Sequence, residues 1–245
     1  TVNLAASLAA TKRRILLIDL DPQGNATMGS GISKNEVEKT AYDLLTKKAK
    51  IEDIITRSEL GKYDVIPANG DLTAAEVELL NEIGREHRLK SVLNSVRENY
   101  EFILIDCPPS LNMLTVNALS ASDGVIIPMQ CEYYALEGLA ALMNTVEQIR
   151  ETINPKLTIS GILRTMYDPR NSLTRDVSSE LEEYFADKVY KVAIPRNVRL
   201  AEAPSHGMSA LHYDKASKGA IAYLALAGEI VRKEKAESRA ALAEA

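Results

Sequence analysis

Short apolar runs and longer amphipathic stretches alternate along most of this 245-residue chain. A run such as Ile15-Leu16-Leu17-Ile18, bounded by polar residues, is typical of a strand buried on both faces of a parallel sheet. The pattern predicts strands at 15–19, 63–66, 102–106, 124–128, 157–163 and 189–194. Apolar residues at helical spacing predict helices near 2–11, 36–47, 51–57, 73–82, 86–98, 111–120, 135–153, 173–186 and 216–238.

Regular alternation of strands and helices indicates βαβ units with right-handed crossovers. The expected fold class is therefore α/β: a doubly wound, mostly parallel sheet with helices on both faces. No internal repeat or low-complexity linker divides the chain, so we expect residues 1–231 to form a single domain. Residues 232–245 are rich in Ala, Glu, Lys and Arg, which predicts a charged helical tail.

Composition changes this picture little. Hydrophobic residues make up 46% and charged residues 26% of the chain, which is ordinary for a globular protein. The formal net charge of -5 means that any contact with nucleic acid would need a local basic patch. Cys107 and Cys131 lie in strand-like runs without metal-ligand spacing, which favours reduced core thiols. No apolar run approaches about 18 residues, so no membrane-spanning helix is expected.

Acidic residues stand at the carboxyl ends of two predicted strands. Asp19 and Asp21 follow the first strand, and Asp106 ends the strand at 102–106. Open α/β sheets bind ligands at this edge, and Mg²⁺ accepts one or two carboxylates together with phosphate oxygens. An acid at a strand end can also cap the next helix, and Asp21 followed by Pro22 suits that role. Acids on two strands of one sheet favour a cation or phosphate site.

Four sequence blocks resemble, in order, the ParA/Soj family of partition ATPases, which belongs to the MinD/ParA superfamily. Residues 19–27 resemble the family's deviant Walker A-prime element, and residues 106–110 (Asp-Cys-Pro-Pro-Ser) resemble its Walker B element. Residues 130–138 and 194–207 are similar to two further family blocks. Because the four blocks span nearly the whole chain, the resemblance implies a P-loop NTPase-like fold and ATPase activity, with ATP and Mg²⁺ as cofactors.

One family element is not found in this sequence. Family members begin with a strand and a deviant Walker A loop, K-G-G-x-G-K-[ST]-T, followed by a helix that resembles residues 1–9. The sequence contains no G-x-x-x-x-G-K-[ST] motif. The backbone N–H groups and the lysine of such a loop hold the phosphates. We therefore expect an amino-terminally truncated fragment, with the first strand and the P-loop absent, that binds ATP poorly and hydrolyses little of it.

The resemblance also implies roles for individual residues. Asp21 would orient or polarise the water that attacks the γ-phosphate. Asp19 would support Mg²⁺ and its waters, and Asp106 would hold the metal through water. The family places adenine at residues 195–197, so Pro195, Arg196 and Asn197 would contact the base. A simple strand-exit turn is the other interpretation of these three residues.

The resemblance further implies an ATP-dependent homodimer that binds nonspecific DNA and a ParB-like centromere-binding protein. Such a protein would be cytoplasmic and nucleoid-associated, with no contact to membranes. Nonspecific DNA binding requires lysines and arginines that meet phosphates. The candidates are Arg170, Lys215, Lys218, Arg232 and Lys235. Spacing of three within each carboxyl-terminal pair places its partners on one helical face, although a solvated helix surface would show the same spacing.

Three other functions compete with this interpretation. A MinD-type positioning ATPase would need an apolar and basic amphipathic helix at the carboxyl terminus, but residues 233–245 are too acidic for such a helix and contain only one large apolar residue, Leu242. A phosphatase of the haloacid-dehalogenase type would use the Asp-x-Asp pair, yet it prefers Thr or Val where this chain has Gln23. A non-catalytic scaffold stays open for this chain.

Overall fold

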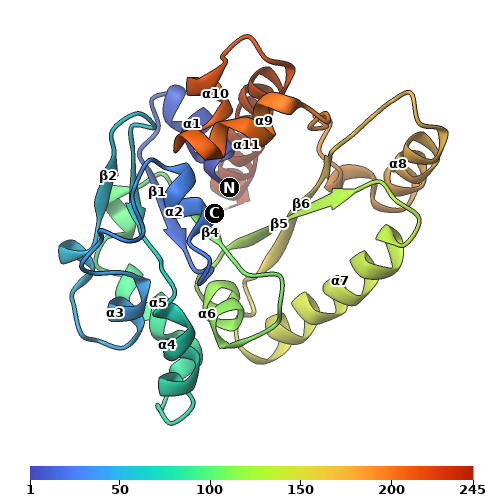
Figure 1. Cartoon of the computed structure of the whole chain (residues 1–245). Coiled ribbons are helices and arrows are strands. Elements are labelled where there is room, and N and C mark those ends of the chain that lie inside the picture. The colour runs from blue at the N-terminus through green and yellow to red at the C-terminus, as the bar shows by residue number, and fades with distance from the viewer. Residues whose placement is uncertain (245) are drawn as a thin grey trace.

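The computed structural model describes the backbone of residues 1–244 and the side chains of residues 1–240. Its strands form two groups (Figure 1). The first has the order β2 (Thr56–Ser58), β3 (Tyr63–Ile66), β1 (Ile15–Asp19), β4 (Phe102–Asp106). The second pairs β5 (Gly124–Gln130) with β6 (Thr158–Thr165). Every pairing is parallel except that of β2 with β3.

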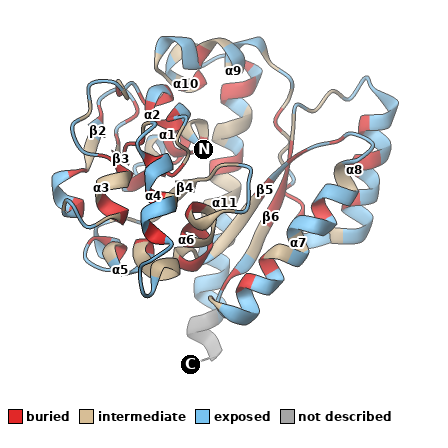
Figure 2. Cartoon of the chain, turned by 60° about the horizontal axis from the view of Figure 1, so that its bottom comes forward, coloured by how far each residue is buried: buried red, intermediate tan, exposed pale blue. Residues whose placement is uncertain are grey.

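Helices cover both faces of the first group of strands. One face packs against α1, α2 and α11, and the other packs against α3, α4, α5 and α6. The helices α7 and α8 pack on β5 and β6, and Figure 2 shows their outer faces as exposed. The bounds are α1 (Val2–Ala10), α2 (Asn25–Gly29), α3 (Ala41–Leu45), α4 (Leu72–Leu79), α5 (Arg88–Leu93), α6 (Met113–Ala121), α7 (Ala135–Thr152), α8 (Ser172–Phe185), α9 (Val198–Glu202), α10 (Ala210–Tyr213) and α11 (Lys218–Glu244).

The predicted fold class, an α/β protein with a mostly parallel sheet between helices, is confirmed. The reason is visible in β1, where all five residues are buried. Leu16 and Ile18 face one core, while Ile15 and Leu17 face the other, because successive side chains of a strand point to opposite faces. A strand with two apolar faces is stable only between two layers of helices.

The strands predicted at 15–19, 63–66 and 102–106 form with those bounds. The strand predicted at 189–194 is wrong, since that segment makes only isolated bridges near β6. Its backbone groups bind side chains in place of a neighbouring strand. The guanidinium of Arg164 donates to the carbonyls of Tyr190 and Lys191, and the amides of Lys191 and Val192 donate to Glu229. These contacts interrupt the ladder of hydrogen bonds.

The helix predicted at 51–57 is also wrong over most of its length. A single 3-10 turn at Ile51–Asp53 is followed by the edge strand β2. Arg57 reaches across to Asp64 on β3 at 2.8 Å, and the hydroxyl of Ser58 donates to the carbonyl of Ser30 at 2.7 Å. These contacts with distant residues favour the strand over the local helical pattern.

The last helix continues through the point where we predicted a separate tail. α11 runs from Lys218 to Glu244 without interruption at residue 232, and Ala245 lies outside the described residues. The ammonium group of Lys233 donates to the carbonyl of Ser160 and lies 5.7 Å from the ring centre of Tyr190. None of the helices in the described part of the chain is both long and apolar enough to cross a bilayer.

Candidate nucleotide and metal site

The acids predicted from the two strand ends lie side by side. β1 and β4 are parallel neighbours, and their register pairs Asp19 directly with Asp106. The amide of Leu20 donates to the carbonyl of Asp106 at 2.9 Å, which extends the pairing to the ends of both strands. The carboxyl edge of the sheet therefore presents two adjacent carboxyl groups, at the location where α/β sheets bind ligands.

Asp19 is fully buried and held by three hydrogen bonds. Its Oδ2 atom accepts from the amide and the hydroxyl of Thr27, at 2.8 and 2.7 Å. Its Oδ1 atom accepts from the amide of Asp21 at 3.1 Å. Burial raises the pKa of Asp19 from 3.8 to about 6, against the opposing effect of the Thr27 hydrogen bonds, and the charge of Asp106 contributes in the same direction as burial. A cation bound beside this carboxyl would favour its ionised form.

Asp21 lies on a tight turn between β1 and α2 and is partly exposed. Its Oδ1 atom accepts from the amide of Gln23 at 2.9 Å, and its carbonyl accepts from the amide of Gly24 at 2.9 Å. Gly24 has a φ angle of 63°, and a Cβ atom there would lie 2.7 Å from the carbonyl oxygen of Ala68, so only glycine fits. The residue that caps α2 is Gly24. The alternative that Asp21 caps a helix beginning at Pro22 is therefore wrong.

Asp106 is partly exposed and accepts a hydrogen bond from the hydroxyl of Thr1. The next residue, Cys107, has its pKa raised to about 12 by burial and by the neighbouring acids, so its thiol stays protonated at neutral pH. Cys107 and Cys131 are both free thiols, as the sequence predicted. Neither is activated as a nucleophile, since the pKa of Cys131 is also raised by burial.

The donor set at this edge fits a hard divalent cation that brings other ligands with it. Within the described residues, no group of three or more His, Cys, Asp or Glu side chains is arranged to hold a metal ion. Mg²⁺ does not require such a cage, because it keeps several waters and takes one or two carboxylates plus phosphate oxygens. Asp19 and Asp106 supply carboxylates of that kind on adjacent strands.

Pro195, Arg196 and Asn197, which we predicted to contact adenine, directly follow the segment 189–194 that lies beside β6. The amide of Tyr167 donates to the carbonyl of Ile194 at 3.0 Å, and the amide of Arg196 donates to the carbonyl of Tyr167 at 3.2 Å. The side chain of Asn197 accepts from the amide of Arg199 at 3.1 Å and so caps α9. Pro195 and Asn197 are partly exposed and Arg196 is exposed, so the segment forms a turn that leaves side chains open to a ligand.

This segment belongs to a longer block, residues 194–207, whose last residue packs against the chain at the end of α2. A Cβ atom on Gly31, just after α2, would lie 3.0 Å from the carbonyl oxygen of Gly207. Gly207 ends the predicted block 194–207, and α2 follows the turn of Asp21 directly. The structure therefore places the end of the predicted block 194–207 against Gly31, four residues beyond the end of the predicted block 19–27.

The basic residues predicted to bind DNA lie on two loops and along α11. Lys215 precedes α11 and Lys218 is its first residue, so the expectation that they share a helical face is wrong. Arg232 and Lys235 do lie three residues apart on α11, about 21 Å along the helix axis from Lys218. All four side chains belong to exposed residues.

Arg170, the fifth candidate, lies on the loop between β6 and α8 with 87% of its side chain exposed. Its guanidinium donates to both oxygens of Asp168, at 2.9 and 2.7 Å. These hydrogen bonds lower the pKa of Asp168 to about 2, so that carboxylate is ionised at neutral pH. A phosphate that binds Arg170 therefore competes with Asp168.

Sequence reasoning missed the part that Thr27 plays in the site. Its hydroxyl donates to Asp19 and also accepts from the amide of Ala68 at 2.9 Å. Thr27 therefore joins the acidic turn to the loop between β3 and α4. A threonine eight residues after an aspartate gives no local signal of this contact, because only the fold brings Ala68 to it.

The site and fold together define a class of protein: a P-loop NTPase-like α/β protein with acids at the carboxyl edge of its parallel strands. The comparisons with known proteins agree. A family model described as an AAA domain matches residues 1–159. The chain is 33% identical to cobyrinic acid a,c-diamide synthase from Mycobacterium smegmatis, solved with bound ADP and magnesium, with a TM-score of 0.82 over 95% of this chain and 87% of that one.

Two curated relatives narrow the class. The sporulation initiation inhibitor protein Soj of Bacillus subtilis is 54% identical over 230 residues, which cover 94% of this chain and 91% of the relative. The chromosome partitioning protein ParA of Caulobacter vibrioides is 49% identical over 236 residues, covering 96% of this chain and 88% of the relative. The chain belongs to the ParA/Soj family of chromosome-partitioning ATPases.

Proposed function

We propose that this protein is an ATP-dependent partition switch. It is a Mg²⁺-dependent ATPase whose bound nucleotide sets its homodimerisation and its residence on nonspecific DNA, and a ParB-like centromere-binding protein stimulates its turnover. The observation that carries the proposal is the pairing of Asp19 with Asp106 at the ends of adjacent parallel strands, beside a turn that presents Asp21.

Asp21 orients the water that attacks the γ-phosphate in this proposal. Its carboxylate is partly exposed, and the amide of Gln23 fixes one of its oxygens. Asp106 holds Mg²⁺ through water, and Asp19 supports the metal and its waters from the buried side. Phosphoryl transfer depends mostly on positioning and charge stabilisation, so displacement of one carboxylate would lower the rate by orders of magnitude.

In this proposal, the adenine of the nucleotide and the DNA bind to separate surfaces of the protein. Pro195, Arg196 and Asn197 contact adenine, which their exposure on the turn after residue 194 supports. Arg170, Lys215, Lys218, Arg232 and Lys235 contact DNA phosphates, and their exposure supports that role. Their separation along the molecule favours a DNA that crosses several elements, which suits binding without base recognition. Association with the nucleoid follows from such binding.

The test is the Asp21→Ala variant of the full-length gene product. We expect it to bind Mg²⁺-ATP and to dimerise as the parent protein does, while the hydrolysis rate falls by at least about 100-fold, since water is no longer oriented. Calorimetry measures binding, and phosphate release in the presence of DNA and a ParB-like protein measures turnover. The matched control is Asp187→Ala, which changes an exposed acid of a 3-10 turn after α8. Unchanged hydrolysis in Asp21→Ala would remove that residue from the mechanism, and no ATP binding by the parent protein would end the proposal.

A further inference from the structure

Lys34, on the loop after α2, reaches back to the turn that carries Asp21. Its ammonium group donates to the carbonyl of Gln23, eleven residues earlier in the chain, at 2.6 Å. The amide of the same Gln23 donates to Oδ1 of Asp21 at 2.9 Å. Two hydrogen bonds through one residue therefore connect a cationic side chain with the carboxylate that orients water in the proposed function.

The aliphatic part of Lys34 packs against the same turn. A Cβ atom added to Gly24 would lie 3.0 Å from Cδ of Lys34 and 2.7 Å from the carbonyl oxygen of Ala68. The backbone of Gly24 is therefore enclosed between the lysine stem and the loop after β3. Lysine stems commonly cover apolar or backbone surface while the charged head stays at its polar partner. A shift of the turn toward solvent has to displace the Lys34 side chain.

The backbone from which Lys34 extends is fixed by the protein core. Ile32, two residues earlier, is buried among side chains of α1 and β1. Its amide donates to the carbonyl of Thr27 at 3.3 Å, and the amide of Glu36 donates to the carbonyl of Ser33 at 3.0 Å. Because its base is held in this way, Lys34 loses only side-chain entropy when it binds the turn.

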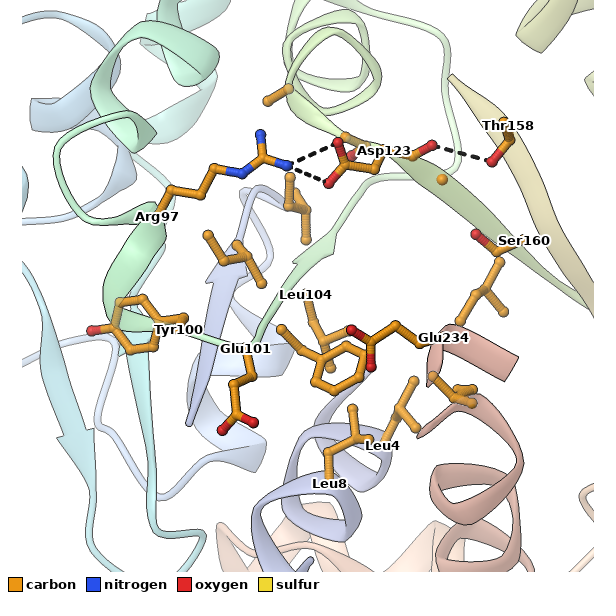
Figure 3. A pocket seen from close by; sticks show the side chains of 18 of the residues that line it. Leu4, Leu8, Arg97, Tyr100, Glu101, Leu104, Asp123, Thr158, Ser160 and Glu234 are labelled. Atoms are coloured by element: carbon orange, nitrogen blue, oxygen red, sulfur yellow. Dashed lines mark hydrogen bonds and ion pairs between the residues drawn. The ribbon is translucent and has the colours of Figure 1, made fainter. Parts of the chain in front are cut away.

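No acidic side chain accounts for the position of Lys34. Cations elsewhere on the surface pair with carboxylates, as Lys39 does with Asp53 at 3.7 Å. Figure 3 shows a second example, the ion pair of Arg97 and Asp123 at the rim of the cavity beside β4 and β5. Among residues 1–240, Lys34 forms no such pair. A backbone carbonyl of the turn is the group that holds its ammonium, and a hydrogen bond from a charged donor is stronger than a neutral one.

We propose that Lys34 is a positioning residue for ATP hydrolysis, which keeps the turn of Asp21 in the arrangement that lets this carboxylate orient the attacking water. The inference rests on the role of Asp21 in the proposed function. Lys34 touches no reacting atom, since it acts through Gln23 and Gly24. A misplacement of about 1 Å can cost about 100-fold in rate, so loss of this contact lowers kcat and leaves the affinity for nucleotide nearly unchanged.

The experiment measures ATP binding and turnover in the Lys34→Met variant of the full-length gene product. Methionine keeps an unbranched stem against Gly24 but cannot donate to Gln23. We expect kcat to fall by at least about 10-fold, while the Kd for Mg²⁺-ATP stays within about 3-fold of that of the parent protein. The matched control is Lys39→Met, which removes a 45% exposed lysine of the same segment and should turn over at the parent rate.

Chemical rescue separates positioning by the ammonium group from packing by the stem. Lys34→Cys is made in a background without Cys107 and Cys131, and that background sets the reference rate. Alkylation with 2-bromoethylamine gives a side chain of the length of lysine that ends in an ammonium group. Alkylation with 1-iodopropane gives a side chain of the same length without a donor. We expect the first adduct to recover most of the reference rate and the second to stay at least about 10-fold below it.

Three results would overturn the inference. The kcat of Lys34→Met could lie within about 2-fold of the parent value, or its Kd for Mg²⁺-ATP could rise as much as kcat falls, which would indicate a contact with the nucleotide. The two alkylated proteins could also turn over at the same rate, which would leave only a packing role. Failure of the parent protein itself to bind or hydrolyse ATP would instead end the proposed function.

Discussion

Replacement of Asp19 by asparagine tests whether burial controls the charge of the site. The pKa of this fully buried carboxyl is raised from 3.8 to about 6, and burial is the largest cause. At 1.36 kcal/mol for each tenfold change in acidity, ionised Asp19 makes the folded protein less stable by about 3 kcal/mol than protonated Asp19 does.

The sign follows from proton binding. A carboxyl with a raised pKa binds its proton more tightly in the folded than in the unfolded protein, so its full contribution to stability is present below pH 3.8. That contribution is lost as the pH rises through the folded pKa of about 6. Asp19→Asn keeps the acceptor for Thr27 but places an amide group opposite the Asp21 amide, which costs about 1–2 kcal/mol at every pH.

The assay is urea denaturation of the parent protein and the variant at a series of pH values from 4 to 8. We expect Asp19→Asn to be less stable than the parent at pH 4 and about 1 kcal/mol more stable at pH 8, so the difference changes by about 2.4 kcal/mol over this range. Asp187→Asn, which changes an exposed acid, is the control and should show a flat difference. A change of less than about 1 kcal/mol for Asp19→Asn over this range would refute the reasoning.

Three further predictions concern the turn, the segment beside β6 and the DNA surface. Gly24→Ala should destabilise the protein by at least about 1–2 kcal/mol in urea denaturation, because of its φ angle of 63°, whereas Gly70→Ala, with nothing within 4 Å, should stay within about 1 kcal/mol of the parent. Arg164→Leu should lower the free energy of unfolding by about 3–5 kcal/mol, since it removes a buried guanidinium that is bonded to two carbonyls and an acid. Arg150→Leu, at an exposed position of α7, should change the free energy of unfolding by less than about 1 kcal/mol. Arg170→Ala should weaken retention on nonspecific DNA at low salt and lower the slope of log affinity against log salt by about one, measured by fluorescence anisotropy; an unchanged slope, equal to that of Arg150→Ala, would exclude a phosphate contact.

The sequence predictions were accurate where the structure of a segment depends on residues near it in the sequence, and inaccurate where it depends on residues far away in the sequence. The strands at 15–19 and 102–106 were predicted with their bounds because each is a short apolar run that ends in an aspartate. The segment 189–194 has a similar pattern but depends on Arg164 and Glu229, which are distant in the sequence. Nothing in the pattern of 189–194 indicates that side chains satisfy its backbone.

The candidate site likewise has features that the sequence could predict and features that it could not. The acids at the strand ends were predictable, since strand direction alone places Asp19 and Asp106 at one edge. The burial of Asp19 and its bonds to Thr27 were not, because they depend on how the chain returns after Gly24. The dispersal of the basic residues along α11 was likewise visible only once the start of that helix was known.

The hydroxyl of Thr27 makes the acidic turn and the loop after β3 thermodynamically dependent on each other. One oxygen atom donates to Asp19 and accepts from Ala68, so neither contact can change without affecting the other. Any molecule that binds the loop and shifts Ala68 must therefore alter the affinity of the acidic edge for its ligand. Linkage makes the effect reciprocal: the ligand changes the affinity of the loop for that molecule by the same factor. A single hydroxyl group thus provides a route by which events on the surface near α4 can be communicated to the acids of the sheet.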